Sequence, residues 1–204
     1  MVEVLRSSTF LLLRNWEFTL AWIVFFTIPL VITPLPYVGF LAFFFILLFF
    51  NSTTQYFVKV LSKNEKSLEI KEIFKIKKPV FSFSLGESVY LFFTALLYYL
   101  FTKFYAVLFF WWWFYKPFLE KELYYARTFE DGFKALLILL LRPNWKYIKL
   151  GLRWSFIGLV LLTIAVLLVL SIAGVLLASF VVLLLSVVLA HFTAETILRI
   201  KTLA

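Results

Sequence analysis

Long apolar blocks alternate with charged segments along the chain. The apolar blocks are residues 18–58, 79–119 and 154–194. The first and third blocks hold no Lys, Arg, Asp or Glu, and the second holds only Glu87, Lys103 and Lys116. Each block is about twice the ~20 residues that an α-helix needs to cross the hydrocarbon core of a bilayer. Because backbone in lipid must keep its hydrogen bonds within helices, each block is predicted to fold back as a hairpin of two helices.

Residues that favour turns stand near the middle of the blocks. In the first block, residues 33–36 (Thr-Pro-Leu-Pro) place two prolines where a helix must stop. In the third block, residues 171–174 supply a glycine, and in the second Lys103 would be stranded in lipid without a turn. The hairpins are therefore predicted at residues 18–58, 85–119 and 154–197. Their six helices are predicted at residues 18–32, 37–58, 85–102, 104–119, 154–171 and 174–197.

The composition supports a chain that is embedded in a membrane. Of the 204 residues, 64% are hydrophobic and 15% are charged, against roughly 25% charged residues in an ordinary soluble domain. The mean hydropathy is +0.99. A chain of this size leaves too much surface outside its core to hide so many apolar side chains from solvent, which excludes a soluble globular protein. The predicted fold class is an all-α polytopic integral membrane protein, with a single membrane domain over residues 1–204.

The distribution of cations gives the hairpins an orientation, since the cytoplasmic segments of membrane proteins collect Lys and Arg. With both termini inside, the cytoplasmic segments are residues 1–17, 59–84, 120–153 and 198–204. These segments hold all 20 lysines and arginines except Lys103, when Lys116 is counted with the segment that follows it. The predicted location is the cell membrane, crossed several times, with both termini in the cytoplasm.

Two cytoplasmic segments are predicted to hold helices that lie in the plane of the lipid headgroups. Residues 67–76 place an apolar face opposite their charges, and Pro79 is expected to end this helix. The apolar face consists of Ile70, Ile73 and Phe74. Residues 128–142 begin with Thr128 as a predicted N-cap, and Asp131 follows where the helix dipole favours negative charge.

A short internal repeat precedes the first and third hairpins. Residues 11–18, Leu-Leu-Leu-Arg-Asn-Trp-Glu-Phe, match residues 139–147, Leu-Leu-Leu-Arg-Pro-Asn-Trp-Lys-Tyr, with one inserted proline. Arg reaches lipid headgroups, Asn caps helices and Trp anchors at the membrane interface. Each copy is therefore predicted to end an interfacial helix and to lead into a hairpin.

Three motifs resemble a group of six-helix membrane proteins. They are Phe-Tyr-Lys-Pro-Phe-Leu-Glu at residues 114–120, Phe-Glu-Asp-Gly-Phe-Lys-Ala-Leu at residues 129–136 and Arg-Pro-Asn-Trp at residues 142–145. The group includes the membrane domain fused to some glycerophosphodiester phosphodiesterases and stand-alone relatives of unknown function. The chain departs from it where Leu replaces a frequent Ser in the amphipathic helix, and its 204 residues hold no phosphodiesterase domain. The resemblance, over about residues 5–200, implies a fold and a membrane-organising role rather than diesterase activity.

Few side chains suit catalysis. Without Cys, a nucleophilic triad would have to join Ser, His191 on the last helix and Asp131 in a cytoplasmic segment. The carboxylates that cluster in sequence are Glu120, Glu122, Glu130 and Asp131. They are interpreted as a solvated face balanced by Lys116, Lys121, Arg127 and Lys134. We expect no enzyme activity, no catalytic or metal-binding residues and no cofactor.

Polar residues inside the predicted spans are the candidates for function, because ionisable groups are rare in lipid. The run from Asn51 through Thr54 to Gln55 either lines a pathway or bonds to a neighbouring helix, and the second reading is favoured. Glu87 either belongs to a binding site or closes a Ser-x-x-Glu capping box with Ser84, and capping is favoured.

Two more sets of side chains allow alternative interpretations. His191, Glu195 and Arg199 are spaced to share one face of the last helix. This face is either responsive to protons or anions or is simply ion-paired, and ion pairing is favoured. The tryptophans at residues 111–113 are interpreted as an aromatic belt at headgroup depth rather than a ligand platform.

The predicted function is that of a non-enzymatic membrane protein that contacts lipids, organises the membrane or serves as an accessory subunit. Its expected partners are membrane lipids, anionic ones above all, because the net charge of +9 gathers at the inner leaflet. A membrane protein partner or a second copy of the chain stays open, and no nucleic acid is expected. The alternative is a small-solute or ion transporter or channel subunit that uses residues 51–55 and the face of His191 and Glu195.

Overall fold

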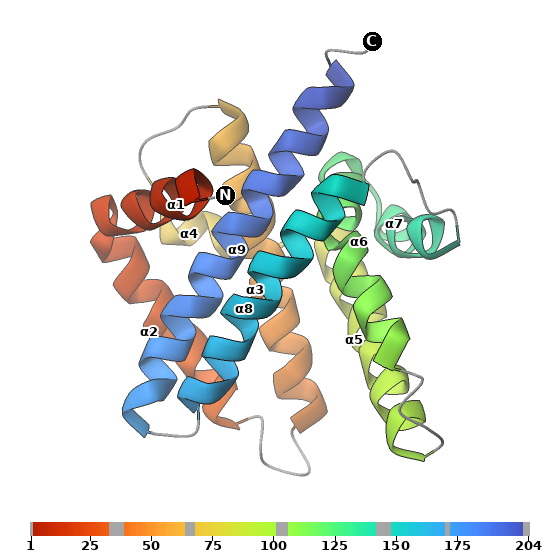
Figure 1. Cartoon of the computed structure of the whole chain (residues 1–204), viewed down its shortest axis with the longest axis horizontal. Helices are drawn as coiled ribbons and strands as arrows, with labels where there is room; N and C mark the ends of the chain where they lie inside the picture. The colour runs from red at the N-terminus through yellow and green to blue at the C-terminus, as the bar shows by residue number, and fades with distance from the viewer. Residues whose placement is uncertain are drawn as a thin grey trace.

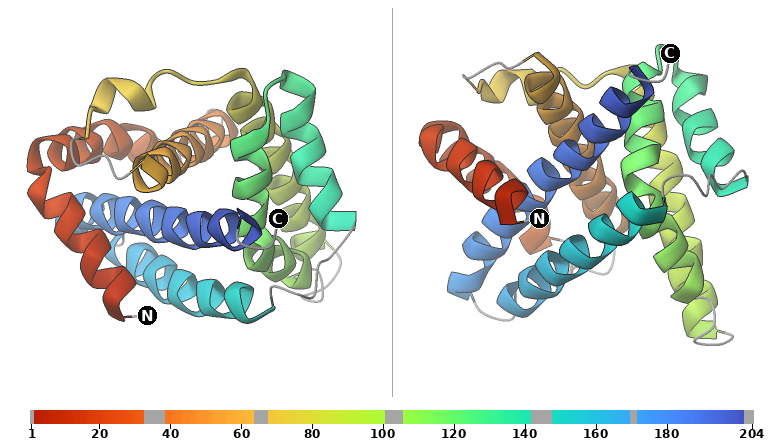
Figure 2. Two further views of the ribbon diagram at one scale, coloured as in Figure 1. Left: turned by 90° about the horizontal axis from the view of Figure 1, so that it is seen from above. Right: turned by 45° about the horizontal axis from the view of Figure 1, so that its top comes forward.

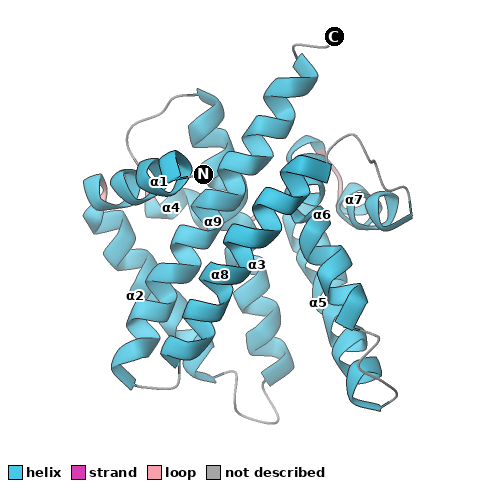
Figure 3. Cartoon of the chain, viewed as in Figure 1, coloured by secondary structure: helices cyan, strands magenta, loops and turns pink. Residues whose placement is uncertain are grey.

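The chain is all-helical in the part that the structure describes. The computed structural model describes residues 2–32, 39–63, 68–100, 106–141, 148–169 and 172–201, and every regular element in these ranges is an α-helix (Figure 3). The helices are α1 (Val2–Arg14), α2 (Trp16–Ile32), α3 (Gly39–Lys63), α4 (Ile70–Ile73), α5 (Lys78–Leu100), α6 (Ala106–Tyr125), α7 (Phe129–Leu141), α8 (Ile148–Val169) and α9 (Ile172–Lys201).

Four helices are long and apolar enough to cross a membrane. They are α3, α5, α8 and, within α9, the stretch Gly174–Leu198. A fifth span results if α1 and α2, which are bent by 94° at their junction, count together. The α2 helix alone has 17 residues, and α6 carries several charges in its second half. The chain is therefore an all-helical protein with four to five candidate spans by length and composition within the described ranges.

The α9 helix is the central element of the bundle. It packs against α1, α2, α3, α6 and α8 (Figures 1 and 2). The α5 helix packs against α3, α6 and α7, so that α3, α5 and α6 form a group beside α9. Two clusters of buried apolar side chains fill the interior, and both include residues of α9. This arrangement brings together polar residues that are far apart in the sequence.

Several helices begin earlier or end later than the apolar pattern predicts. The α5 helix begins at Lys78 rather than residue 85, and α8 begins at Ile148 rather than residue 154. Helical backbone thus continues beyond the apolar blocks into charged residues. Pro79 was expected to end an amphipathic helix, but it stands in the first turn of α5, where a missing N–H costs nothing. The amphipathic helix at residues 67–76 is in fact one short turn, α4. The predicted turns at residues 33–36 and 103 lie outside the described residues. Of the third predicted turn, residue 171 lies outside them as well, whereas residues 172–174 form the start of α9.

A sharp elbow separates α1 from α2 at Asn15. The Asn15 side chain donates to the Leu11 carbonyl at 2.9 Å, and its oxygen accepts the Leu68 N–H at 3.2 Å. Thr19 adds a bond to the Leu12 carbonyl at 2.8 Å. The Thr19 bond satisfies a carbonyl at the end of α1, and the Asn15 oxygen joins the bend to the segment before α4. The second copy of the repeat falls largely on residues 142–147, outside the described part of the chain.

The start of α7 has the predicted cap. The Asp131 N–H donates to the Thr128 hydroxyl at 3.2 Å, and the Thr128 N–H donates back to the Asp131 carboxylate at 2.9 Å. The Arg127 N–H adds a third bond at 3.1 Å. The N–H groups of Thr128 and Arg127 stabilise the charged form and hold the pKa of Asp131 below its ordinary value.

Close packing of α7 on α5 depends on Gly132. A Cβ at Gly132 would overlap the Ser82 hydroxyl and the Pro79 carbonyl oxygen. Ser82 is itself held by a bond to the Phe129 carbonyl at 2.6 Å, so it has little freedom to move.

We expect Gly132→Ala to destabilise the protein by about 1–3 kcal/mol, because overpacking forces the two helices apart. Thermal unfolding in detergent measures the loss. Lys134→Ala, an exposed change two residues along α7, is the matched control and should shift stability by at most about 0.5 kcal/mol. Equal effects of the two substitutions would contradict the close approach of α7 to α5.

Candidate functional site

A buried polar cluster lies where α3, α5 and α6 meet. It consists of Asn51 and Gln55 on α3, Ser84 and Glu87 on α5, and Trp112, Lys116 and Glu120 on α6. Glu87 and Glu120 are 0% exposed, and Lys116 is 1% exposed. Charged groups so far from water are costly unless they are paired and hydrogen-bonded. We refer to these seven residues as the charged cluster.

Glu87 is the best-satisfied group of the charged cluster. One carboxylate oxygen accepts the Asn51 amide at 2.7 Å, and the other accepts the Trp112 indole N–H at 2.8 Å. Lys116 also donates to this second oxygen. The Asn51 amide lies 2.9 Å from the Ser84 hydroxyl as well. Glu87 therefore receives donors from α3 and α6 together and ties the two helices to α5.

Lys116 joins the two carboxylates. Its ammonium donates to Glu87, lies 2.9 Å from a Glu120 oxygen and donates to the Asn51 carbonyl oxygen at 2.8 Å. The other Glu120 oxygen accepts the Gln55 amide at 2.6 Å. The Lys116 ammonium also lies over the aromatic rings of Phe83, Trp112 and Phe50, at 5.0, 5.5 and 5.9 Å from their centres. Such rings attract a cation and keep water away.

The structure corrects two sequence interpretations at this site. Glu87 does not cap a helix, because α5 begins nine residues earlier at Lys78 and Glu87 lies within it. Glu120 and Lys116 do not lie on a solvated face, since they are buried and paired with each other. The other three carboxylates of that predicted face are separate. Glu122 pairs with Lys121 at 2.6 Å, Glu130 with Lys134 at 3.6 Å, and Asp131 caps α7.

The polar run at residues 51–55 divides between two roles. Asn51 and Gln55 belong to the charged cluster, whereas Thr54 donates to the Phe50 carbonyl of its own helix at 3.0 Å. Ser52 donates to the Ile73 carbonyl at 2.7 Å, and Thr53 accepts the Trp22 indole N–H at 2.8 Å. Hydrogen bonds to other elements, the kind that the favoured interpretation predicts, are thus present for Asn51, Ser52, Thr53 and Gln55, whereas Thr54 bonds within α3.

The predicted stripe on the last helix is separate from the charged cluster. His191 and Glu195 are partly buried on α9, and the His191 Nε2 atom makes no hydrogen bond within the described residues. The side chain of Arg199 lies outside the described part of the structure. Among the described residues, α7 and α9 make no contact, so Asp131 and His191 are not brought together as a triad.

The tryptophan run is only partly at the surface. Trp112 and Trp113 are each 4% exposed, which contradicts a belt at headgroup depth for these two residues. Trp112 binds Glu87, and Trp113 stacks on Trp154 with ring centres 5.0 Å apart. Trp111 is partly exposed and packs on Tyr115.

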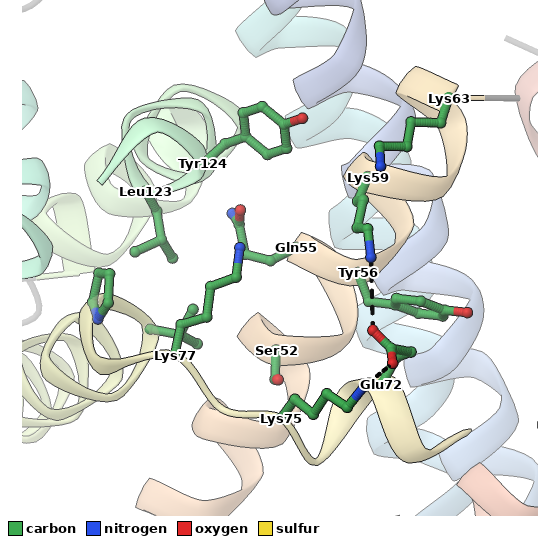
Figure 4. Close-up of a pocket in the computed structure, with 12 residues that line it drawn as sticks. Ser52, Gln55, Tyr56, Lys59, Lys63, Glu72, Lys75, Lys77, Leu123 and Tyr124 are labelled. Carbon is green, nitrogen blue, oxygen red and sulfur yellow. Dashed lines mark hydrogen bonds and ion pairs between the residues drawn. The ribbon is translucent and has the colours of Figure 1, made fainter. Parts of the chain in front are cut away.

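A basic cavity lies beside the charged cluster (Figure 4). It has a volume of about 510 Å³, and Gln55 connects it to the cluster because this side chain lines the cavity and donates to Glu120. The cavity is lined by Ser52, Gln55, Tyr56, Lys59, Lys63, Glu72, Lys75, Lys77, Pro79, Val80, Leu123 and Tyr124. In this part of the described chain, four lysines thus face one glutamate. We refer to this space as the basic cavity.

Glu72 organises part of the basic cavity. Lys75 bonds to one carboxylate oxygen, and Lys59 lies 3.6 Å from the other. The bond from Lys75 lowers the pKa of Glu72. Lys77 extends into the cavity toward Gln55 in Figure 4 and makes no ion pair within the described residues. The lysines therefore leave an excess of positive charge in the cavity.

An apolar cavity of about 690 Å³ lies toward the other end of α3, α5 and α6. Its lining includes Phe43 and Leu47 of α3, Leu91 of α5, and Phe109 and Trp112 of α6. The charged cluster thus lies between the two cavities along α6, with Trp112 at the apolar side and Glu120 at the basic side.

Comparison with known proteins adds no family to this picture. No family model matches the chain, and no solved structure shows a significant match.

Proposed function

We propose that the chain is a non-enzymatic, multi-pass protein of the cell membrane that binds the anionic headgroup of a lipid in the basic cavity. Both termini lie in the cytoplasm in this proposal, and the cavity faces the inner leaflet. The role is to contact and organise lipids or to present a lipid-bound surface to a membrane partner. The similarity in layout to the six-helix group described above points in the same direction.

The basic cavity is the observation that carries the proposal. Lys59, Lys75 and Lys77 surround a space in which Glu72 is the one acidic residue among the described lining residues. Lysine near the surface of an anionic membrane contributes about 1 kcal/mol of attraction. Tyr124 adds a hydroxyl group to the lining, whereas the Tyr56 hydroxyl accepts the Glu69 N–H. A phosphate oxygen accepts hydrogen bonds from these donor types, so a phospholipid headgroup matches the charge and the chemistry of the space.

Six spans are part of the proposal, with α2 and α6 added to the four longest apolar helices. The first half of α6 is apolar and aromatic. Two of its charges, Lys116 and Glu120, are buried against each other and do not face lipid. The α1 helix, bent by 94° from α2, then lies along the membrane surface as the sequence predicts for an interfacial helix.

We expect the double substitution Lys59→Gln and Lys77→Gln to weaken binding of phosphatidylglycerol about 30-fold, because two lysines contribute about 2 kcal/mol. Native mass spectrometry of the protein, released from detergent with added phosphatidylglycerol or phosphatidylcholine, measures the bound fraction. Lys149→Gln removes a charge from an exposed site on α8 outside the cavity and serves as the control.

Two results would contradict the proposal. One is equal loss of binding in the double variant and in Lys149→Gln. The other is equal binding of phosphatidylglycerol and phosphatidylcholine by the unmodified protein. If inorganic phosphate at millimolar concentration binds to the protein and neither lipid does, the cavity is a site for a free anion instead.

A transporter or channel subunit is the second candidate, and the charged cluster favours it. Buried ionisable residues inside a helical bundle mark ion and proton pathways in many membrane proteins. Asn51, Gln55, Glu87 and Glu120 supply the polar groups, whereas the predicted face of His191 and Glu195 lies apart from them on α9. Flux of protons or small ions into proteoliposomes that contain the purified chain, absent in empty vesicles, would replace the first proposal by this one.

A further inference from the structure

The charged cluster has an unbalanced formal charge. It holds two carboxylates, Glu87 and Glu120, and a single ammonium, Lys116. All three are at most 1% exposed. With every group ionised, one negative charge is left without a partner in a region from which water is excluded, which is strongly unfavourable. One additional positive charge restores neutrality.

We infer that the charged cluster binds one exchangeable proton on the Glu120 carboxylate, because both Glu87 oxygens already accept hydrogen bonds from donors. A proton suits the space better than a metal cation, because the Lys116 ammonium already lies against both carboxylates and would repel a second cation. Aromatic rings of Phe50, Phe83 and Trp112 surround the ammonium and offer no oxygen ligands there. A protonated carboxyl becomes a hydrogen-bond donor and needs no ligand shell.

The basic cavity is the side from which the proton enters. Gln55 lines the cavity and donates to Glu120, and Leu123 and Tyr124, one turn further along α6, line it too. At the opposite side of the charged cluster, Trp112 lines the apolar cavity and donates to Glu87. Glu120 therefore stands at the polar end of the charged cluster and Glu87 at the apolar end.

Few other titratable groups interact directly with the Glu120 carboxylate. Lys116 of α6 and Glu87 of α5 interact with it electrostatically, and Gln55 of α3 provides its neutral donor.

The other titratable groups lie further away, across the basic cavity or on other helices. Across the basic cavity lie Tyr56, Lys59 and Lys63 of α3, Glu72 of α4, Lys75 and Lys77 of the segment before α5, and Tyr124 of α6. The α9 helix, which also packs on α6, carries His191 and Glu195. On α7 the charged groups are Glu130, Asp131 and Lys134, and on α8 they are Lys149 and Arg153. The charged side chains that line the cavity are thus mostly cationic.

Infrared spectroscopy of the folded protein in lipid at pH 7 tests the inference. The carbonyl stretch of a protonated carboxylic acid should be present in the unmodified protein and should shift in D₂O. Glu120→Gln and Glu87→Gln should each remove the whole band, because one carboxylate then faces one ammonium and no proton is needed. Glu122→Gln, on the same helix but partly exposed and paired with Lys121, should leave the band unchanged.

Absence of the band in the unmodified protein would overturn the inference, and that result needs no variant to fold. A band that persists in either Glu87→Gln or Glu120→Gln would overturn it as well. Glu120→Asp keeps the charge count and should keep the band, which provides a second test if Glu120→Gln does not fold. The inference rests on the charged cluster alone, so failure of lipid binding in the basic cavity would leave it standing.

Discussion

Replacement of Lys116 by Met should destabilise the protein by about 3–5 kcal/mol. This change leaves Glu87 and Glu120 buried without their shared cation, and removal of one partner of a buried ion pair has a cost of this size. Met has a similar length and fills the space, so loss of packing contributes little. The midpoint of thermal or denaturant unfolding in detergent, followed by circular dichroism, measures the effect.

The loss in Lys116→Met should also depend on pH. Protons neutralise the two stranded carboxylates only in the folded state of this variant, which therefore binds more protons than the unfolded state. Its stability should accordingly fall as pH rises. The triple variant Lys116→Met, Glu87→Gln, Glu120→Gln removes every charge and should recover most of the lost stability.

Lys121→Met is the control for this prediction, because Lys121 pairs with Glu122 at 2.6 Å on a partly exposed part of the same helix. A pair of this kind contributes at most about 1 kcal/mol. Similar losses in Lys116→Met and Lys121→Met would show that the charged cluster is not excluded from water.

The length of the apolar blocks correctly predicted the all-helical fold class, but it did not predict where the helices begin and end. It predicted long helices at the places where α3, α5, α8 and α9 lie. It missed the starts of α5 and α8, because the backbone stays helical through charged residues such as Lys78 and Lys149, which are exposed. Hydropathy reports what solvent surrounds a residue, whereas helix boundaries depend on caps and tertiary contacts.

The charged cluster was only partly visible in the sequence. A local motif, Ser84-x-x-Glu87, suggested a cap and hid the tertiary partner of the glutamate. A usable signal was nevertheless present. In an antiparallel hairpin of residues 85–119, Glu87 near the start of the first helix lies at the same depth as Lys116 near the end of the second helix. Apart from Lys103 at the predicted turn, they are the charged residues of this hairpin, so they could have been paired. The contribution of Asn51 and Gln55 could not be derived, since it depends on how α3 is rotated against α5 and α6.

The tryptophan run was misread for a related reason. An interfacial position explains exposed Trp, but Trp113 and Trp154 face each other from different hairpins. Pro117 lies inside α6 and has no N–H to donate to the Trp113 carbonyl four residues earlier. The Trp154 indole donates to that carbonyl at 2.7 Å. Backbone freed by a proline inside a membrane protein must find such a partner, so Trp154 satisfies a group that α6 leaves open.

Replacement of Trp154 by Ala should therefore destabilise the protein by about 3–5 kcal/mol, a loss in the same range as that of Lys116→Met. Trp154 is 0% exposed and touches Trp113 of α6 and Phe192 of α9, so its removal leaves a cavity at the meeting point of three helices. Thermal unfolding in detergent measures the loss. Trp154→Phe keeps a ring but not the N–H, and it should cost about 1–3 kcal/mol because the Trp113 carbonyl loses its donor.

Trp16→Ala provides the control for this series, because Trp16 is 62% exposed at the start of α2 and should contribute at most about 0.5 kcal/mol within the fold. If Trp154→Phe were as stable as the unmodified protein, the indole bond to the Trp113 carbonyl would be dispensable. Pro117→Ala restores the helical N–H, so in that background the substitution Trp154→Phe should cost less than it does in the unmodified protein. Such a reduction would establish the role of the indole as a substitute donor.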